Sequence, residues 1–181
     1  MSWSDARAES AADRILAAAE RLFAEQGIAA VGMAEVAEAA GCSRATVYRY
    51  FENRGALQLA FVHREARRIV AEVTAETAGI GNADQRRVEA ILATVEAVRR
   101  APQLAAWLRN DNVATLQGIL DSSEIVDGFV RAFLPAGADP EAGRWLLRMI
   151  LSYVVLPGRD ADEECRQVRE FVVPRLSASR V

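Results

Sequence analysis

The sequence predicts an all-α protein of about nine helices, divided between a small N-terminal domain (residues 1–53) and a larger helical domain (residues 54–181). Three observations support this fold class. Apolar residues recur every three or four positions along most of the chain, which is the period of an amphipathic helix. Residues that favour helix starts precede several of these segments, and glycine or proline follows several of them. No segment shows a convincing apolar–polar alternation of the kind that indicates a β-strand.

The first helix is expected to begin at Ser10, because the spacing from Ser10 to Asp13 resembles a capping box. Gly27 follows this helix at the position where a left-handed residue commonly ends one. The apolar face of the segment predicts the side that packs into the core. It consists of Ile15, Leu16, Ala19, Leu22 and Phe23.

Two short helices are expected next, over residues 33–40 and 44–51. Gly41 lies between them, where it can take a left-handed turn that a β-carbon would disfavour. Ser43 is placed to cap the second of the two. The inward-facing side chains that would hold the pair together are Val36, Ala37, Ala40, Val47 and Phe51.

A long helix capped by Asn53 is expected to run to about residue 77, and five more helices follow it. Asp139 before Pro140 is a strong start signal, since aspartate favours the cap and proline the first helical position. The five expected helices cover residues 84–100, 102–120 with a possible break near Asn110, 123–134, 140–156 and 160–176.

Two short helices joined by a glycine-containing turn are typical of a helix-turn-helix, whose second helix enters the major groove of DNA. The second helix here is dense in arginine, tyrosine and threonine, which donate hydrogen bonds to phosphates and base edges. Residues 41–68 carry a net charge of +4, whereas the remaining residues sum to −7. A local basic patch favours a polyanionic partner. An ordinary helical hairpin with a solvated charged face is the alternative.

Residues 15–57, "ILAAAERLFAEQGIAAVGMAEVAEAAGCSRATVYRYFENRGAL", resemble the N-terminal domain of TetR/AcrR-family transcriptional regulators. The rest of the chain shares only length and helical layout with that family. The resemblance implies that Arg44, Ala45 and Tyr48 face base edges. It also implies that four residues contact the phosphate backbone, namely Thr46, Arg49, Tyr50 and Arg54. One departure concerns Gly32-Met33, where the family commonly has threonine, so that only backbone N–H groups could bind phosphate there.

The resemblance further implies a homodimer that binds a palindromic double-stranded operator, usually as a repressor. A small hydrophobic or amphipathic effector would enter the C-terminal domain and release the DNA. An architectural DNA-binding protein without an effector is the alternative, and it predicts a tightly filled C-terminal core.

Large side chains in the C-terminal half are the candidates for an effector pocket, although packing in the core is the alternative for each. They are Trp107, Phe129, Phe133, Trp145, Met149 and Tyr153. The last two helices are the candidates for the dimer interface, because a helix that is apolar on two sides must bury both. The proposed interface residues are Ile150, Val154, Val168 and Val172, and the alternative is that both sides pack within one chain.

Other classes of function find little support in the sequence. No apolar run reaches the roughly 18 residues needed to span a bilayer, and the N-terminus has no signal core, so we expect a cytoplasmic protein without a membrane partner. His63 is the single histidine, and Cys42 and Cys165 match no metal spacing. We therefore expect neither a metal ion nor a cofactor, and no enzymatic activity.

Overall fold

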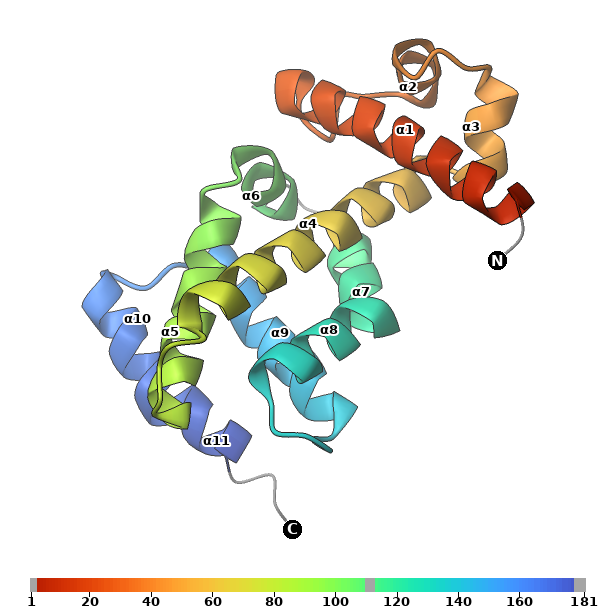
Figure 1. The fold of residues 1–181 in the computed structure, drawn as a ribbon. Coiled ribbons are helices and arrows are strands. Elements are labelled where there is room, and N and C mark those ends of the chain that lie inside the picture. The colour runs from red at the N-terminus through yellow and green to blue at the C-terminus, as the bar shows by residue number, and fades with distance from the viewer. Residues whose placement is uncertain (1–2, 110–112, 178–181) are drawn as a thin grey trace. The chain divides into compact units, whose positions relative to one another are not determined.

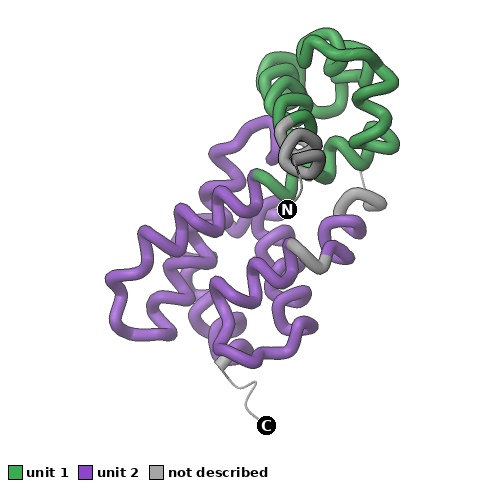
Figure 2. The backbone as a smooth tube through the Cα atoms, turned by 45° about the vertical axis from the view of Figure 1, so that its right-hand side comes forward, with its two compact units in different colours: residues 1–64 green, residues 65–181 purple. Residues whose placement is uncertain are grey.

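The computed structural model describes residues 3–109 and 113–177, and all regular structure in these residues is helical (Figure 1). The chain forms two compact units, residues 1–64 and residues 65–181, which we call unit 1 and unit 2 (Figure 2). The helical structure of the described residues confirms the all-α fold class. None of the described helices is both long enough and apolar enough to cross a membrane.

Unit 1 contains α1 (Trp3–Gln26), α2 (Met33–Ala39), α3 (Arg44–Tyr50) and the first part of α4 (Arg54–Thr77). The expected start of the first helix at Ser10 is wrong, since α1 begins at Trp3. Residues 3–10 contain alanine, arginine and glutamate and neither glycine nor proline, so nothing in them stops a helix from extending toward the N-terminus.

The core of unit 1 is built from the apolar faces predicted for the first three helices and from the start of α4. The rings of Phe23 and Phe61 meet edge to face, with centroids 5.2 Å apart. Asn53 caps α4 as expected, because its Oδ1 atom accepts a hydrogen bond from the Ala56 N–H at 2.9 Å. The side chains with almost no exposed surface include Ile15, Phe23, Ile28, Val31, Val36, Val47 and Leu57.

The first unit extends beyond the predicted boundary at residue 53 and includes α4 as far as Arg64. Ion pairs between α4 and α1 partly explain why this part of α4 belongs to unit 1. The Arg64 guanidinium lies 2.6 Å from a carboxylate oxygen of Asp13 and 3.3 Å from one of Glu20, both on α1. The beginning of the long helix is therefore attached to the first helix of the chain.

Unit 2 contains the rest of α4 and all later helices, with α5 packing against α6, α8, α9 and the last helical stretch. That last stretch is continuous and passes through one π-helical segment, η1. The expected break near Asn110 lies outside the described residues. The helices of unit 2 are α5 (Ala83–Arg99), α6 (Pro102–Arg109), α7 (Val113–Asp121), α8 (Ser123–Phe133), α9 (Pro140–Val155), α10 (Ala161–Gln167), η1 (Val168–Val172) and α11 (Val173–Ser177).

The four side chains predicted to form a dimer interface belong to the core of unit 2. Ile150 and Val154 are each 2% exposed, Val168 is 0% exposed and Val172 is 3% exposed within a single chain. Side chains with so little accessible surface belong to the core of one chain. For these four residues this burial favours the alternative, that both apolar sides of the two helices pack within one chain.

A buried ion pair connects the last helical stretch to α5. The Arg99 guanidinium donates hydrogen bonds to both carboxylate oxygens of Glu164, at 2.6 and 2.9 Å, and to the Tyr153 carbonyl at 2.7 Å. Glu164 is only 6% exposed, and it also accepts a hydrogen bond from the Gly158 N–H at 2.7 Å. One buried carboxylate thus links α10 to α5 and to the loop that follows α9.

We predict that Glu164→Gln lowers the free energy of unfolding by about 2–3 kcal/mol, because Arg99 would lose a charged partner in a largely buried place. Glu163→Gln is the matched control, since Glu163 pairs with the exposed Arg159 instead, and its loss should be smaller. Urea denaturation of both variants measures the difference. Equal losses would show that burial of the Glu164 pair is unimportant.

The same ion pair should make stability depend on pH. The hydrogen bond from Arg99 lowers the pKa of the Glu164 carboxyl from its usual 4.5. The contribution of Glu164 is therefore complete above pH 4.5 and disappears as the pH falls through the lowered pKa. We expect the stability difference between the wild type and Glu164→Gln to shrink over that acid range. A difference that stayed constant would contradict the lowered pKa.

Candidate nucleic-acid interface

A glycine turn sets the direction in which α3 leaves α2. Gly41 adopts a φ angle of +63°, as its position between the two helices predicted. The Gly41 N–H donates to the Glu38 carbonyl, and the Cys42 N–H donates to the Ala37 carbonyl, each at 3.0 Å. This pair of hydrogen bonds is a Schellman motif, which ends a helix and needs a left-handed residue at this place.

The start of α3 is capped as the sequence predicted. Ser43 Oγ accepts a hydrogen bond from the Thr46 N–H at 3.1 Å, and it lies 2.9 Å from Thr46 Oγ1. Val47 is the buried residue of α3 and has no accessible surface. The side of α3 that carries Val47 packs into the core of unit 1. The other side chains of this short helix therefore lie on its remaining sides.

The three residues predicted to face base edges are all exposed. Arg44, Ala45 and Tyr48 lie at successive and one-turn spacings, so they share one side of α3. Tyr48 is 51% exposed, which is unusual for a residue with so large an aromatic side chain. An exposed surface with a guanidinium, a methyl group and a phenol matches the chemistry of a major-groove contact.

Arg49 and Tyr50 form a pair at the end of α3. The Arg49 guanidinium carbon lies 5.0 Å from the centre of the Tyr50 ring, and its Nη2 donates to the Tyr50 hydroxyl at 3.2 Å. Arg49 is exposed, whereas Thr46 and Tyr50 are half-buried. The pair keeps one cation and one hydroxyl together beside the face that carries Tyr48, which suits a phosphate group.

Arg54 is placed differently from what the family pattern implied. It is half-buried, and its Nη2 donates to the carbonyls of Ala29 and of Ile28, the latter at 3.4 Å. Gln58 Nε2 also donates to the Ile28 carbonyl, at 3.1 Å. Arg54 therefore holds the loop between α1 and α2 against the start of α4. We assign it to this loop rather than to DNA phosphate.

The start of α2 is also different from the expectation of a bare phosphate-binding helix end. The Gly32 N–H donates to Glu35 Oε2 at 2.7 Å, so a carboxylate already occupies this end of the helix. Moreover, Arg64 pairs with Asp13, and Arg68 pairs with Glu65 at 2.8 Å. The net charge of +4 already counts Glu65 but not Asp13, so the ion pair of Arg64 with Asp13 makes the basic patch smaller than that number. Within residues 41–64, which belong to unit 1, the exposed arginines are Arg44 and Arg49 of α3.

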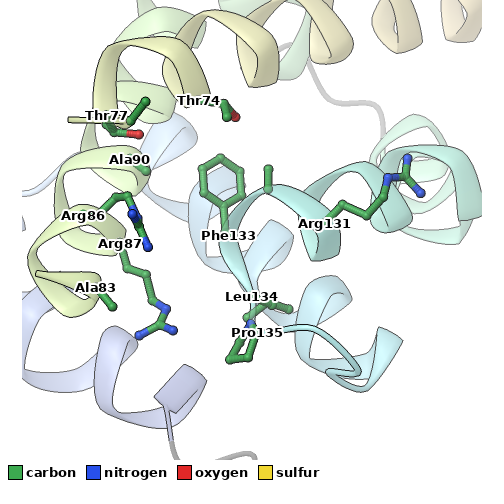
Figure 3. A pocket seen from close by; sticks show the side chains of 12 residues that line it. Thr74, Thr77, Ala83, Arg86, Arg87, Ala90, Arg131, Phe133, Leu134 and Pro135 are labelled. Carbon is green, nitrogen blue, oxygen red and sulfur yellow. The ribbon is translucent and has the colours of Figure 1, made fainter. Parts of the chain in front are cut away.

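Unit 2 contains a cavity of about 450 Å³ between the last turn of α4, the first turns of α5 and the end of α8 (Figure 3). Of the predicted ligand residues, Phe133 lines this cavity. Phe129 is buried and packs against Phe133, with the centroids of these two rings 5.3 Å apart. Trp145, Met149 and Tyr153 are partly exposed on α9 and do not line it, and the side chain of Trp107 lies outside the described ones.

Sequence reasoning missed the residues that give the cavity its polar character. Arg86 and Arg87 come from the first turns of α5, and Thr74 and Thr77 come from the last turns of α4. The Thr77 hydroxyl is satisfied by the Val73 carbonyl at 2.8 Å. The two adjacent arginines shortly after the Asn82 cap could have indicated this polar wall. Residues near the start of a helix lie beside the preceding loop and the ends of neighbouring helices.

Comparison with known proteins identifies the class to which this architecture belongs. Residues 15–61 match the family described as "Bacterial regulatory proteins, tetR family", and these residues include α2, α3 and the start of α4. An HTH-type transcriptional regulator of Mycobacterium tuberculosis, Rv1255c, is 43% identical to the chain over 179 residues, which are 95% of this chain and 89% of that protein. The chain therefore belongs to the TetR family of transcriptional regulators, which bind DNA.

Two solved structures show the same fold over nearly the whole chain. The TetR-family repressor AlkX from Dietzia is 23% identical with a TM-score of 0.67, and 92% of this chain and 97% of that chain are covered. FadR of Thermus thermophilus, a TetR-family repressor in complex with lauroyl-CoA, is 19% identical with a TM-score of 0.60, covering 94% and 95%. Family and relatives are transcriptional regulators and not enzymes, as the sequence analysis expected.

We predict that Arg54→Ala destabilises the protein by about 1–3 kcal/mol, because the Ile28 and Ala29 carbonyls would lose a charged donor. Arg14→Ala on the exposed side of α1 is the matched control and should change stability little. Thermal unfolding measures both. The salt dependence of DNA binding should keep its slope in Arg54→Ala. A fully stable variant with a flattened slope would return Arg54 to a phosphate contact.

Proposed function

We propose that this protein is a cytoplasmic, ligand-responsive repressor that binds a palindromic operator as a homodimer and is released by a small hydrophobic or amphipathic effector. The observation that carries the proposal is the placement of α4. Its first two turns hold the α1–α2 loop of the DNA-binding unit through Arg54 and Gln58, and its last turns line the cavity of unit 2. One helix thus joins the candidate effector cavity to the helix-turn-helix.

The exposed face of α3 supports its role as the DNA-reading helix. Arg44, Ala45 and Tyr48 would contact base edges, while Thr46, Arg49 and Tyr50 would contact phosphates. Two cations, Arg44 and Arg49, are exposed on this helix. Sequence preference should therefore depend on few side chains, with Arg44 the main hydrogen-bond donor to a guanine edge.

The cavity supports an effector. Its volume of about 450 Å³ lies within the range of roughly 300–1,000 Å³ that is usual for small-molecule sites. An architectural protein without an effector predicts a tightly filled core, and a cavity at the last turn of α4 favours the effector-responsive alternative. FadR of Thermus thermophilus was solved with lauroyl-CoA, so a repressor of this fold takes an amphipathic ligand.

In such a mechanism the ligand and the operator stabilise different arrangements of the same protein. A ligand that fits the cavity better in one arrangement shifts the population toward it, and the coupling free energy is usually about 1–3 kcal/mol. α4 is the element through which we propose that this shift reaches α3, since Thr74 and Thr77 in its last turns border the cavity.

A homodimer places two copies of α3 on two half-sites of a palindrome. Because Ile150, Val154, Val168 and Val172 are buried in one chain, the interface needs other side chains. The exposed large apolar residues of the same region are Leu156, which is 74% exposed, and Phe171, which is 67% exposed. We propose that Phe171, on the outer side of η1, lies in the dimer interface.

For the DNA contact, we predict that Arg44→Ala loses about 1–3 kcal/mol of preference at one base position in each half-site. Arg100→Ala, an exposed arginine at the end of α5, is the control and should leave the preference intact. Binding to a set of single-base operator variants measures both. An unchanged preference in Arg44→Ala would remove this residue from base reading.

For the dimer, we predict that Phe171→Asp gives a monomer in sedimentation equilibrium while keeping its helical circular dichroism. Operator affinity should fall strongly, because one monomer contacts only one half-site. Ile150→Asp is the contrasting variant, and we expect it to lose more than about 4 kcal/mol of stability by burying an unpaired charge. A dimer that persists in Phe171→Asp would place the interface elsewhere.

A further inference from the structure

The cavity of unit 2 carries charges that a purely apolar effector would not need. Three of its 12 lining residues are arginines, namely Arg86, Arg87 and Arg131, and none of the 12 is an aspartate or a glutamate. The other lining residues are threonines, alanines and the apolar group at the end of α8. Asp84, which pairs with Arg87, is not among the lining residues. The wall formed by Arg86 and Arg87 therefore favours a ligand that carries negative charge.

Charge and apolar surface lie on different walls of this cavity (Figure 3). Arg86 and Arg87 extend from the first turns of α5, whereas Phe133 and Pro135 face them from the end of α8. The guanidinium of Arg131 points away from the Phe133 ring. An elongated ligand could therefore place a charged end at α5 and an apolar part against α8.

Each of the two α5 arginines makes one contact that a ligand could replace. Arg87 lies 2.6 Å from Asp84, and the two side chains are 18% and 63% exposed. Solvent therefore screens this pair from the Asp84 side, and an ion pair screened in this way contributes modestly to stability. Arg86 donates to the Ile80 carbonyl at 3.4 Å, which is long for a hydrogen bond. A ligand carboxylate could take the place of Asp84 on Arg87 and of the Ile80 carbonyl on Arg86.

We propose that the effector is an anionic amphiphile, with an oxyanion such as a carboxylate bound by Arg86 and Arg87 and an apolar chain packed against Phe133 and Leu134. This inference rests on the proposed function, because it names the chemical class of the effector. Arginine binds carboxylates through two parallel hydrogen bonds, which makes a neighbouring pair selective for an anion. The N-terminal end of α5 adds a favourable dipole at the same place.

Isothermal titration calorimetry of the full chain tests the charge preference directly, with three probes that share a ten-carbon chain and stay below micelle formation. Decanoate is anionic, decan-1-ol is neutral and decyltrimethylammonium is cationic. We expect decanoate to bind about tenfold more tightly than decan-1-ol, and the cation to bind more weakly than either, since charge-assisted hydrogen bonds have this scale. Equal affinities for decanoate and decan-1-ol would overturn the proposal.

Arginine variants test the assigned residues. The double variant Arg86→Gln with Arg87→Gln should lose about tenfold or more in decanoate affinity and keep the affinity for decan-1-ol. Arg166→Gln, an exposed arginine on α10, is the matched control and should keep the preference for decanoate. If the double variant fails to fold by circular dichroism, the two single variants serve the same purpose. If folded variants kept the full preference for decanoate over decan-1-ol, the assignment of the anion site to Arg86 and Arg87 would be overturned.

Operator retention by decanoate-treated protein separates this inference from the proposed function. If decanoate binds preferentially but operator DNA is neither bound nor released, the proposed repressor function fails and the headgroup site stands. If decan-1-ol and decanoate bind equally and release DNA equally, the effector function stands and the anionic class fails.

Discussion

The DNA-binding face depends on the burial of a single side chain, Val47. α3 has seven residues, and a helix so short is not stable alone in water, so tertiary packing must hold it. Val47 has no exposed surface, and α3 packs against α1 and α2. The Gly41 turn and the Ser43 cap fix where the helix begins. Because only the side of α3 that carries Val47 packs against the core, Arg44 and Tyr48 remain exposed on its other sides.

Arginine performs several structural tasks in a chain that contains no lysine. Its guanidinium has five donors in a fixed plane, so that one side chain can serve two acceptors at once. Arg54 binds two loop carbonyls, and Arg99 binds both oxygens of Glu164 together with the Tyr153 carbonyl. Arg44 and Arg49 are exposed on α3, which leaves the proposed DNA contact to few cations. Arg67 and Arg68 are exposed as well but belong to unit 2, so the net charge of residues 41–68 does not lie within the DNA-binding unit alone.

Helix ends were predictable from sequence because they follow from local chemistry. Asp139 and Asp160 accept hydrogen bonds from first-turn N–H groups, as their sequence positions indicated. The burial partner of an apolar face was not predictable, since Ile150 would be apolar whether it faced its own chain or a second copy. Aromatic content was a poor guide to the cavity, because large side chains such as Phe129 fill space. The cavity forms instead where alanines and threonines leave room.

We propose that α3 reads DNA as part of a two-fold assembly, and sequencing of the genomic DNA fragments that the purified protein retains is the decisive experiment. We expect enrichment of an inverted repeat, with its two halves separated by a whole number of helical turns or nearly so. The retained fragments should be lost progressively as salt is raised, because phosphate contacts release counterions. Enrichment of no sequence, or of a single unrepeated site, would show that α3 does not read DNA in a two-fold assembly.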